Sequence, residues 1–253
     1  MKITFLGTGT SQGVPVIACE CAVCTSLDKR DKRLRVSVMI EHEGKVIVID
    51  SGPDFRYQML RAGVKHLDAI VFTHEHKDHI AGLDDIRAFN FKQQSAVDVF
   101  AHVRVQEALK REFAYIFANF KYPGIPMLNL KDIDSEPFDI SGITFIPIQV
   151  MHYRLPVLGF RIGDFTYITD AKTISESERE KIRGSKILVI NALQRESHIS
   201  HFDLKEAIAF AEDIQADKTY FTHVSHRMGK HEEISKELPQ NVEFAYDGLV
   251  LEV

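Results

Sequence analysis

Short runs of apolar residues along the chain predict a series of β-strands. Two alternating runs around Glu43-Gly44 predict a hairpin, and continuous apolar runs at 67–72 and 186–191 predict strands buried on both faces. Residues 242–253 alternate around Asp247-Gly248, which predicts a closing hairpin. The remaining predicted strands lie at 2–6, 97–101, 143–150 and 218–222, and residues 157–169 are predicted to form a hairpin that turns at Gly163-Asp164.

The segments between these strands have the spacing and the end signals of helices. Pro53 and Gly63 mark the start and end of one helix, and Asp203 caps another over 203–215. Helices are also predicted at 103–120 and, from a Ser175 capping box, at 175–184. Hairpins come first in each half, followed by helices and strands. This order predicts an α/β fold, an αββα sandwich of two mixed β-sheets packed face to face with helices outside, as a single domain over 1–253.

Composition narrows the protein class without fixing a function. The chain has 253 residues, of which 45% are hydrophobic and 26% charged, with a formal net charge of −5. No apolar run is long enough to span a membrane, and the opening MKITFLGTGTS is not typical of a signal peptide. The acidic balance disfavours a nucleic-acid surface, and three clustered cysteines indicate reduced thiols. We therefore expect a cytoplasmic protein that does not bind membrane and for which nucleic acid is a disfavoured partner.

A cluster of metal-ligand residues directly follows the predicted strand at 67–72. His74, His76, Asp78 and His79 lie within the sequence THEHKDH. In an extended segment residues i and i+2 project to the same side, so His74 and His76 can bind one ion. Asp78 and His79 can then face a neighbouring ion. Neutral imidazole and carboxylate are ligands suited to zinc, iron or manganese.

THEHKDH matches the T-H-x-H-x-D-H signature, so the chain resembles the metallo-β-lactamase superfamily, whose fold is the αββα sandwich. The resemblance implies further ligands at strand ends, namely His152, Asp170 and His223, with Asp50 supporting the ligands. It implies two catalytic divalent ions, Zn²⁺ or Mn²⁺, with hydroxide bound between them as the nucleophile. The implied ligands are His74, His76 and His152 on one ion, Asp78, His79 and His223 on the other, and Asp170 shared between them.

The three cysteines, Cys19, Cys21 and Cys24, have the close spacing of a thiolate metal site, but such sites take four ligands. Within the superfamily, a group that includes phosphoribosyl 1,2-cyclic phosphate phosphodiesterases has a similar C-x-C-x-x-C cluster. The resemblance to this group implies that His226, three residues after His223, completes a structural Zn²⁺ site. Lys121–Pro126 also resembles an insertion of this group.

The same resemblance implies that His201 donates a proton to the leaving group, with Asp78 also in the catalytic set; His198 is left without a role. It implies a metal-dependent phosphoric diester hydrolase acting on a small phosphodiester, such as a ribose or nucleotide cyclic phosphate. Two alternatives stay open: a non-catalytic carrier of the pyrroloquinoline-quinone biosynthesis type, and a tRNA 3′-processing endonuclease. A homodimer also stays open.

Overall fold

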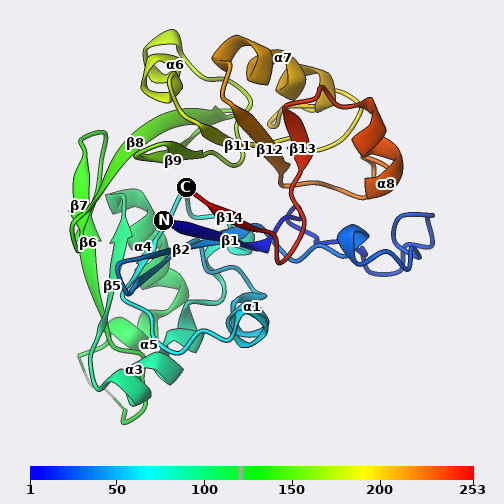
Figure 1. Cartoon of the computed structure of the whole chain (residues 1–253). Coiled ribbons are helices and arrows are strands. Elements are labelled where there is room, and N and C mark those ends of the chain that lie inside the picture. The colour runs from blue at the N-terminus through cyan, green and yellow to red at the C-terminus, as the bar shows by residue number, and fades with distance from the viewer. Residues whose placement is uncertain (120–121) are drawn as a thin grey trace.

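The computed structural model describes residues 1–119 and 122–253, and in this part of the chain the strands form two seven-stranded sheets (Figure 1). The first sheet has the order β14 (Val250–Glu252), β1 (Lys2–Gly7), β2 (Ser37–His42), β3 (Lys45–Ile49), β4 (Ala69–Val71), β5 (Val97–Ala101) and β6 (Leu128–Asp132). The second has the order β13 (Val242–Phe244), β12 (Lys218–Thr222), β11 (Ile187–Asn191), β10 (Phe165–Tyr167), β9 (Leu155–Ile162), β8 (Ile143–His152) and β7 (Phe138–Ile140).

Helices cover the outer face of each sheet, which confirms the predicted αββα sandwich (Figure 1). The first sheet is covered by α1 (Phe55–Ala62), α2 (Lys77–Ile80), α3 (Arg87–Gln93), α4 (Val103–Glu112) and α5 (Ala114–Phe117). The second is covered by α6 (Glu176–Ile182), α7 (Leu204–Ile214) and α8 (His231–Ile234). Short 3₁₀ helices occupy Lys29–Asp31, Leu83–Ile86 and Ser235–Glu237.

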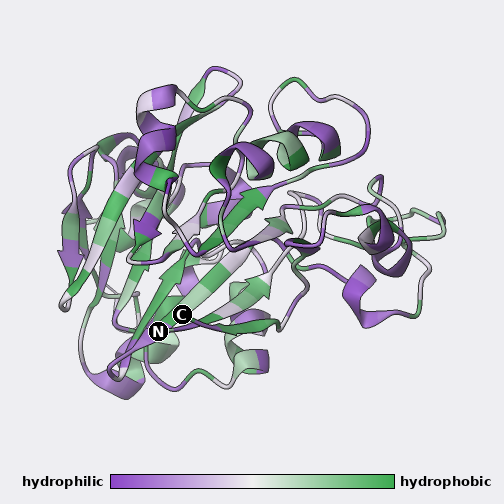
Figure 2. Ribbon diagram, turned by 45° about the horizontal axis from the view of Figure 1, so that its top comes forward, coloured by the Kyte–Doolittle hydropathy of each residue, from purple (hydrophilic) through white to green (hydrophobic). Residues whose placement is uncertain are grey.

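The hydrophobic core lies in three layers, one between the sheets and one beneath each set of helices. Phe5 from the first sheet and Phe145, Phe160 and Tyr167 from the second are fully buried in the central layer. Apolar strands fill the middle of the molecule, and the helices present polar residues outward (Figure 2). Both sheets are therefore held by apolar burial on their two faces, as the continuous apolar runs predicted.

Strand direction brings many loops to one end of the sandwich. Strands β3 to β6 are parallel to one another, and so are β10 to β13, whereas the remaining pairs are antiparallel. Because parallel strands end at the same edge, the loops after β3, β4, β10 and β12 gather together. The polar residues that follow these strands are thereby placed side by side.

The end signals of the helices are largely confirmed. Gly63 caps α1 with a left-handed φ of 66°, and Asp203 forms a reciprocal capping box with Glu206 at α7. The helix predicted over 103–120 is interrupted at Phe113, which separates α4 from α5. Phe120 of that helix and Lys121 of the predicted insertion lie outside the described residues. None of the helices that the structure describes is long and apolar enough to cross a membrane.

The predicted closing hairpin is wrong. β13 pairs with β12 in the second sheet, whereas β14 pairs with β1 in the first. The turn between them bonds to the N-terminal segment instead of across a hairpin. Asp247 accepts hydrogen bonds from the Thr8 hydroxyl and the Leu34 N–H, each at 2.8 Å. These hydrogen bonds hold the turn in the position where the chain passes from the second sheet to the first.

The segment from Thr8 to Val36 extends from the sandwich as a long loop, shown in blue in Figure 1. The amide N–H of Val224 donates to the carbonyl of Thr8 at 2.9 Å, which fixes the base of the loop to the end of β12. Buried Arg33 donates to the carbonyl of Ala245 at 2.6 Å and contacts His231 Nδ1 at 3.2 Å. The loop is therefore joined to the C-terminal third of the chain by buried polar contacts.

Candidate metal centre

The structure brings the seven residues expected to bind the catalytic ions to one end of the sandwich. Each follows or ends a strand, so the side chains enter the same space from both sheets. Five of them are buried with an exposed fraction below 10%. They are His74, His76, Asp78 and His79 after β4, His152 at the end of β8, Asp170 after β10 and His223 after β12.

Asp78, His79 and His223 form a close group with ligand atoms within 4.8 Å of one another. The Nε2 atom of His79 lies 3.4 Å from a carboxylate oxygen of Asp78 and 3.3 Å from one of Asp170. His223 Nε2 lies 3.2 Å from Asp170. Two ligand atoms each about 2.1 Å from a tetrahedral ion stand about 3.4 Å apart. This half of the site therefore fits the spacing of ligands around one ion.

The second half contains three imidazoles that face one another. The ring centres of His74 and His76 are 4.6 Å apart, those of His76 and His152 5.1 Å, and those of His74 and His152 6.0 Å. Asp170 lies close to both halves, because its carboxylate groups with His74 and His79 and also with His152. It occupies the place expected of a shared ligand.

Several imidazoles are held by one ring nitrogen while the other faces the centre. His79 Nδ1 contacts Asp50 at 2.7 Å, His74 Nδ1 contacts the Thr73 hydroxyl at 2.9 Å, and His152 Nδ1 contacts the Ser200 carbonyl at 2.8 Å. Among the described residues, the buried Nε2 atoms of His74 and His79 have no hydrogen-bond partner. A buried nitrogen without a hydrogen-bond partner fits the role of a metal ligand. In metal-binding histidines, the other ring nitrogen forms a hydrogen bond that fixes the orientation of the ring.

The negative charges of the carboxylates at the centre favour binding of a cation. Three carboxylates, those of buried Asp50 and Asp170 and of partly buried Asp78, form ion pairs only with histidines in the described parts of the chain. Burial acts to lower the pKa of His79, but these three carboxylates outweigh it and raise that pKa well above its usual value. Burial lowers the pKa of His74 and keeps that imidazole neutral. A divalent ion would replace the proton on His79 and balance the carboxylates.

The backbone turns sharply where the strands deliver these side chains. Asp50, Asp170 and His223 have left-handed φ values of 64°, 56° and 56°, which residues other than glycine seldom adopt. Gly52 lets the chain pass close to the ligand loop, since a Cβ there would lie 2.0 Å from the Asp78 carbonyl oxygen. Strained conformations of this kind concentrate at functional sites.

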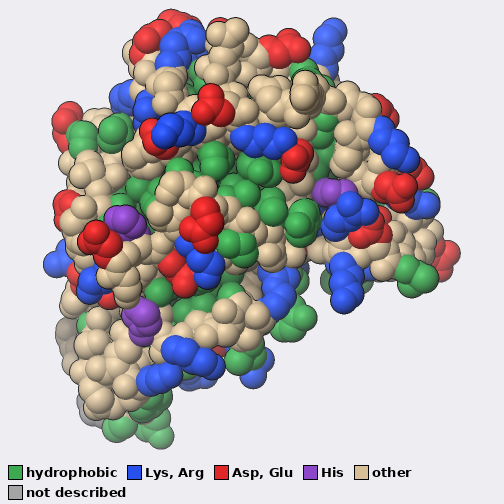
Figure 3. All heavy atoms as spheres, viewed as in Figure 1, with side chains coloured by type: hydrophobic (Ala, Val, Ile, Leu, Met, Phe, Trp, Pro, Cys, Tyr) green, Lys and Arg blue, Asp and Glu red, His purple; other side chains and the backbone are tan. Residues whose placement is uncertain are grey.

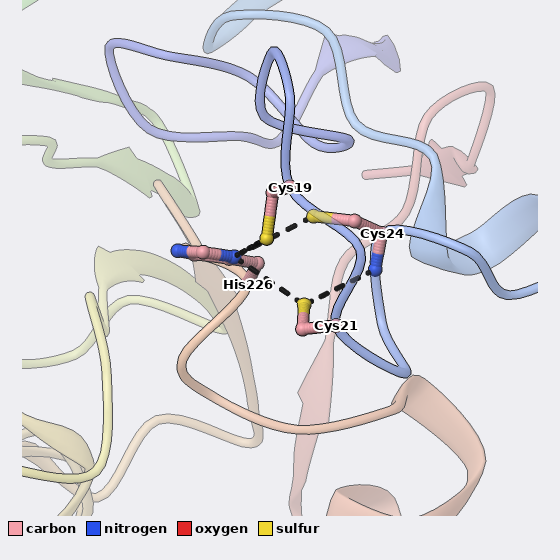
Figure 4. A group of neighbouring side chains, drawn as sticks. All are labelled: Cys19, Cys21, Cys24 and His226. Carbon is pink, nitrogen blue, oxygen red and sulfur yellow. Dashed lines mark hydrogen bonds between the residues drawn. The ribbon is translucent and has the colours of Figure 1, made fainter.

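The thiolate cluster forms a second, separate group. Cys19, Cys21 and Cys24 point toward His226, which approaches from the loop after β12 (Figure 4). The Nδ1 atom of His226 lies 3.2, 3.4 and 3.5 Å from their three sulfur atoms. Zinc about 2.3 Å from sulfur and about 2.0 Å from nitrogen would separate the two atoms by about 3.5 Å. The donor set and its spacing therefore fit one tetrahedral Zn²⁺.

Backbone groups tune these thiols. The Cys24 N–H donates to the Cys21 sulfur at 3.5 Å and lowers the pKa of the Cys21 thiol to about 6. Burial raises the pKa of the Cys24 thiol to about 11, although the Val16 N–H donates to its sulfur at 3.3 Å. Because the thiolate is the form that binds metal, Cys21 is prepared to ligate at neutral pH.

Comparison with known proteins identifies the family. The family model described as "Beta-lactamase superfamily domain" matches residues 45–224. A solved structure described as "a New Diphosphatase from the PhnP Family" is 42% identical, with a TM-score of 0.93 over 100% of this chain and 97% of that one. The chain belongs to the PhnP family of the β-lactamase superfamily. The family and this neighbour support a hydrolase.

Two other relatives show how far the likeness extends. A Porphyromonas gingivalis protein named octanoyltransferase is 40% identical over 98% of this PhnP-family chain, which spans 51% of that protein. The chain thus spans about half the length of this curated relative. Zn²⁺-bound PqqB from Methylobacterium extorquens has a TM-score of 0.81 over the full length of both chains at 17% identity, a likeness that shows the fold alone.

His201 lies at the edge of the PhnP-family metal centre. Its Nε2 atom is 3.1 Å from the Asp170 carboxylate, and its ring centre is 4.4 Å from that of His152. On its other side, His201 Nδ1 lies 3.0 Å from the Ser200 hydroxyl and 3.2 Å from His198 Nδ1. His198, left without a role from the sequence, thus contacts His201. The contact between the Ser200 carbonyl and His152 could not be predicted from the sequence, because every residue has a backbone carbonyl.

Proposed function

We propose that this protein hydrolyses a small phosphodiester, such as a ribose or nucleotide cyclic phosphate. The seven converging ligands would hold two divalent ions, which when bound acidify a water and neutralise the negative charge of a phosphodiester. The ligand set consists of imidazoles and carboxylates, which are side chains suited to zinc and manganese. A water activated by two such ions would supply the nucleophile without a covalent intermediate on the protein.

The position of His201 carries the proposal. A phosphodiester with a sugar or alkyl substituent releases an alkoxide, which is a poor leaving group unless it receives a proton. His201 lies beside the proposed shared ligand Asp170 and is itself 8% exposed, so it adjoins the place where phosphorus would sit. An imidazole here can donate its Nε2 proton to the departing oxygen, a contribution of typically ~10²–10⁴-fold.

The protonation of His201 depends on its surroundings. Burial lowers the pKa of His201 to about 4, and the hydrogen bond to Asp170 opposes this shift. The negative charge of a bound phosphodiester favours the imidazolium in the same way as Asp170 does. In the proposed role, His201 carries a proton on Nε2 when the diester is bound, and the leaving oxygen receives that proton.

The overall charge of the protein favours a small substrate. On the face shown in Figure 3, Lys and Arg side chains are intermixed with Asp and Glu, so this face has no continuous basic field. A net charge of −5 agrees with this distribution. Proteins that bind tRNA use basic surfaces to contact the phosphate backbone. A cyclic phosphate or a short diester fits these charges better than RNA.

His201→Ala tests the proposal through the leaving group. Hydrolysis of alkyl phosphodiesters should fall ~10²–10⁴-fold, mainly in kcat, because the proton acts only in the transition state. Hydrolysis of bis-nitrophenyl phosphate should fall far less, because nitrophenolate needs no proton. Elemental analysis should find both catalytic ions retained, and His66→Ala, which changes a surface histidine, should behave as the wild type. Equal losses on both substrates, or loss of an ion, would refute the acid role.

A second candidate is hydrolysis of a diphosphate, favoured by the description of the 42% identical neighbour as a diphosphatase. A phosphate leaving group needs little protonation, so His201 would then matter much less. Assaying cyclic phosphates, linear diesters and nucleoside diphosphates with wild type and His201→Ala separates the two functions. The name of the 40% identical relative makes octanoyl transfer a third activity to assay with the same protein. Octanoyl transfer without diester turnover would reject the proposal.

A further inference from the structure

Tyr153 adopts a backbone conformation that its side chain disfavours, directly beside the proposed metal ligand His152. Strands β8 and β9 form a hairpin in which His152 pairs with Leu155, so Tyr153 and Arg154 alone make the turn. The φ angle of Tyr153 is 56°, whereas a two-residue turn of this shape favours glycine or asparagine. A bulky residue in this region is an outlier, and outliers of this kind concentrate at ligand-binding sites.

The Tyr153 ring is both exposed and held in place. Its side chain is 51% exposed, and the Arg154 guanidinium lies 5.1 Å from the ring centre, in the range of a cation–π contact. The contact with Arg154 occupies one face of the ring. The ring is thereby ordered without being buried, which lowers the entropy lost when a ligand contacts it.

A second exposed apolar side chain stands next to the same ligands. The hydrogen bond of 2.8 Å between His152 and the Ser200 carbonyl draws the loop before α7 against the β8–β9 hairpin. Ile199, adjacent to Ser200, is 66% exposed. Tyr153 and Ile199 therefore adjoin the two residues joined by this bond, one on each segment. Both lie one residue away from groups that position the proposed metal pair and His201.

We propose that Tyr153 stacks on the nucleobase of the substrate, so that the preferred phosphodiester is a nucleotide. This inference rests on the proposed function, in which phosphorus sits beside Asp170 and His201. The Tyr153-Arg154 turn directly follows His152, whose ring centre is 4.4 Å from that of His201, so the organic arm of the diester can reach Tyr153. A nucleobase is a planar ring that can stack on tyrosine, and Arg154 adds positive charge near an anionic ligand. Stacking of this kind supplies roughly a 5- to 150-fold preference.

The test compares two substrates that differ only in the base. Wild type should hydrolyse adenosine 2′,3′-cyclic phosphate with a kcat/KM roughly 5- to 150-fold above that of methyl riboside 2,3-cyclic phosphate. Tyr153→Gly should bring this ratio close to one, through KM for the adenosine substrate, and Tyr153→Phe should keep it. Gln94→Gly is the matched control, since Gln94 also has a left-handed φ of 55° but lies at the end of α3.

Binding and stability give readouts independent of turnover. Calorimetry should show tighter binding of AMP than of ribose 5-phosphate to wild type, with the difference lost in Tyr153→Gly. Because glycine relieves the strained φ, Tyr153→Gly should melt no lower than wild type. An unchanged substrate ratio and unchanged AMP preference in Tyr153→Gly would overturn the inference. If no phosphodiester is hydrolysed, the proposed function fails, and the AMP comparison alone decides the role of Tyr153.

Discussion

Replacing Cys21 with serine tests whether the thiolate cluster stabilises the fold through zinc. Cys21 is the exposed member of the cluster, so serine fits its position without disturbing buried packing. Serine is a poor zinc ligand, and the remaining Cys19, Cys24 and His226 cannot complete a tetrahedral site. The variant should therefore lose the structural ion while both sheets keep their cores.

The expected size follows from the sequence separation that the site spans. His226 lies 207, 205 and 202 residues after Cys19, Cys21 and Cys24. A cross-link that closes a loop of this length removes about 5 kcal/mol of conformational entropy from the unfolded chain. For a protein of this size each kcal/mol corresponds to roughly 2–4 °C in melting temperature. Loss of the ion should lower the melting temperature by about 10–20 °C.

Urea unfolding followed by circular dichroism measures the free energy, and elemental analysis counts the zinc. Glu20→Gln is the matched control, because Glu20 is an exposed neighbour of Cys21 in the same loop. Its zinc content and unfolding midpoint should equal those of the wild type. If Cys21→Ser loses one zinc yet unfolds at the wild-type midpoint, the stabilising role is refuted. Wild type without sulfur-bound zinc by X-ray absorption would refute the site itself.

Two further changes test the catalytic centre and the buried contacts of the N-terminal loop. Asp170→Asn removes charge from the shared ligand position, so elemental analysis should show at least one catalytic ion lost and activity should fall about 10²-fold or more; full activity with both ions bound would contradict this. Burial and the neighbouring Arg33 lower the pKa of His231 to about 4. The unfolded chain then binds a proton below about pH 6.5 that the folded chain resists, so wild type should lose about 1–3 kcal/mol between pH 7 and pH 4.5. His231→Gln should lose less over this range in urea unfolding, and an equal loss would exclude His231 as the source.

Much of the fold, and the grouping of the candidate ligands at one end of it, could be predicted because both follow from local sequence patterns. Each proposed ligand follows an apolar run, so strand ends and candidate ligands such as His74 and Asp170 are recognisable together. The thiolate cluster is equally local, except for His226, whose link to the cysteines rests on resemblance to a family. A ligand that lies about 200 residues from the others in the sequence cannot be recognised from the spacing of the cysteines.

The features that escaped prediction depend on long-range contacts. Alternation around Asp247-Gly248 has the pattern of a hairpin, but bonds from Thr8 and Leu34 direct the turn between two sheets. Ser200 supports His152 through a carbonyl that every residue possesses. The left-handed backbone conformation of Tyr153 depends on the pairing of β8 with β9. It could not be predicted, because tyrosine seldom adopts that conformation.

The thiolate cluster also imposes an order on biosynthesis. Cys19, Cys21 and Cys24 are made early, whereas His226 follows Cys24 by 202 residues. A nascent chain therefore displays three thiols without their fourth ligand until β11 and β12 have been synthesised. A chain that stalls before His226 lacks the fourth ligand, so its three thiols stay open to oxidants. A zinc ion at this site would therefore be captured late in translation, and the reactivity of the three thiols would distinguish an unfinished chain from a zinc-loaded complete one.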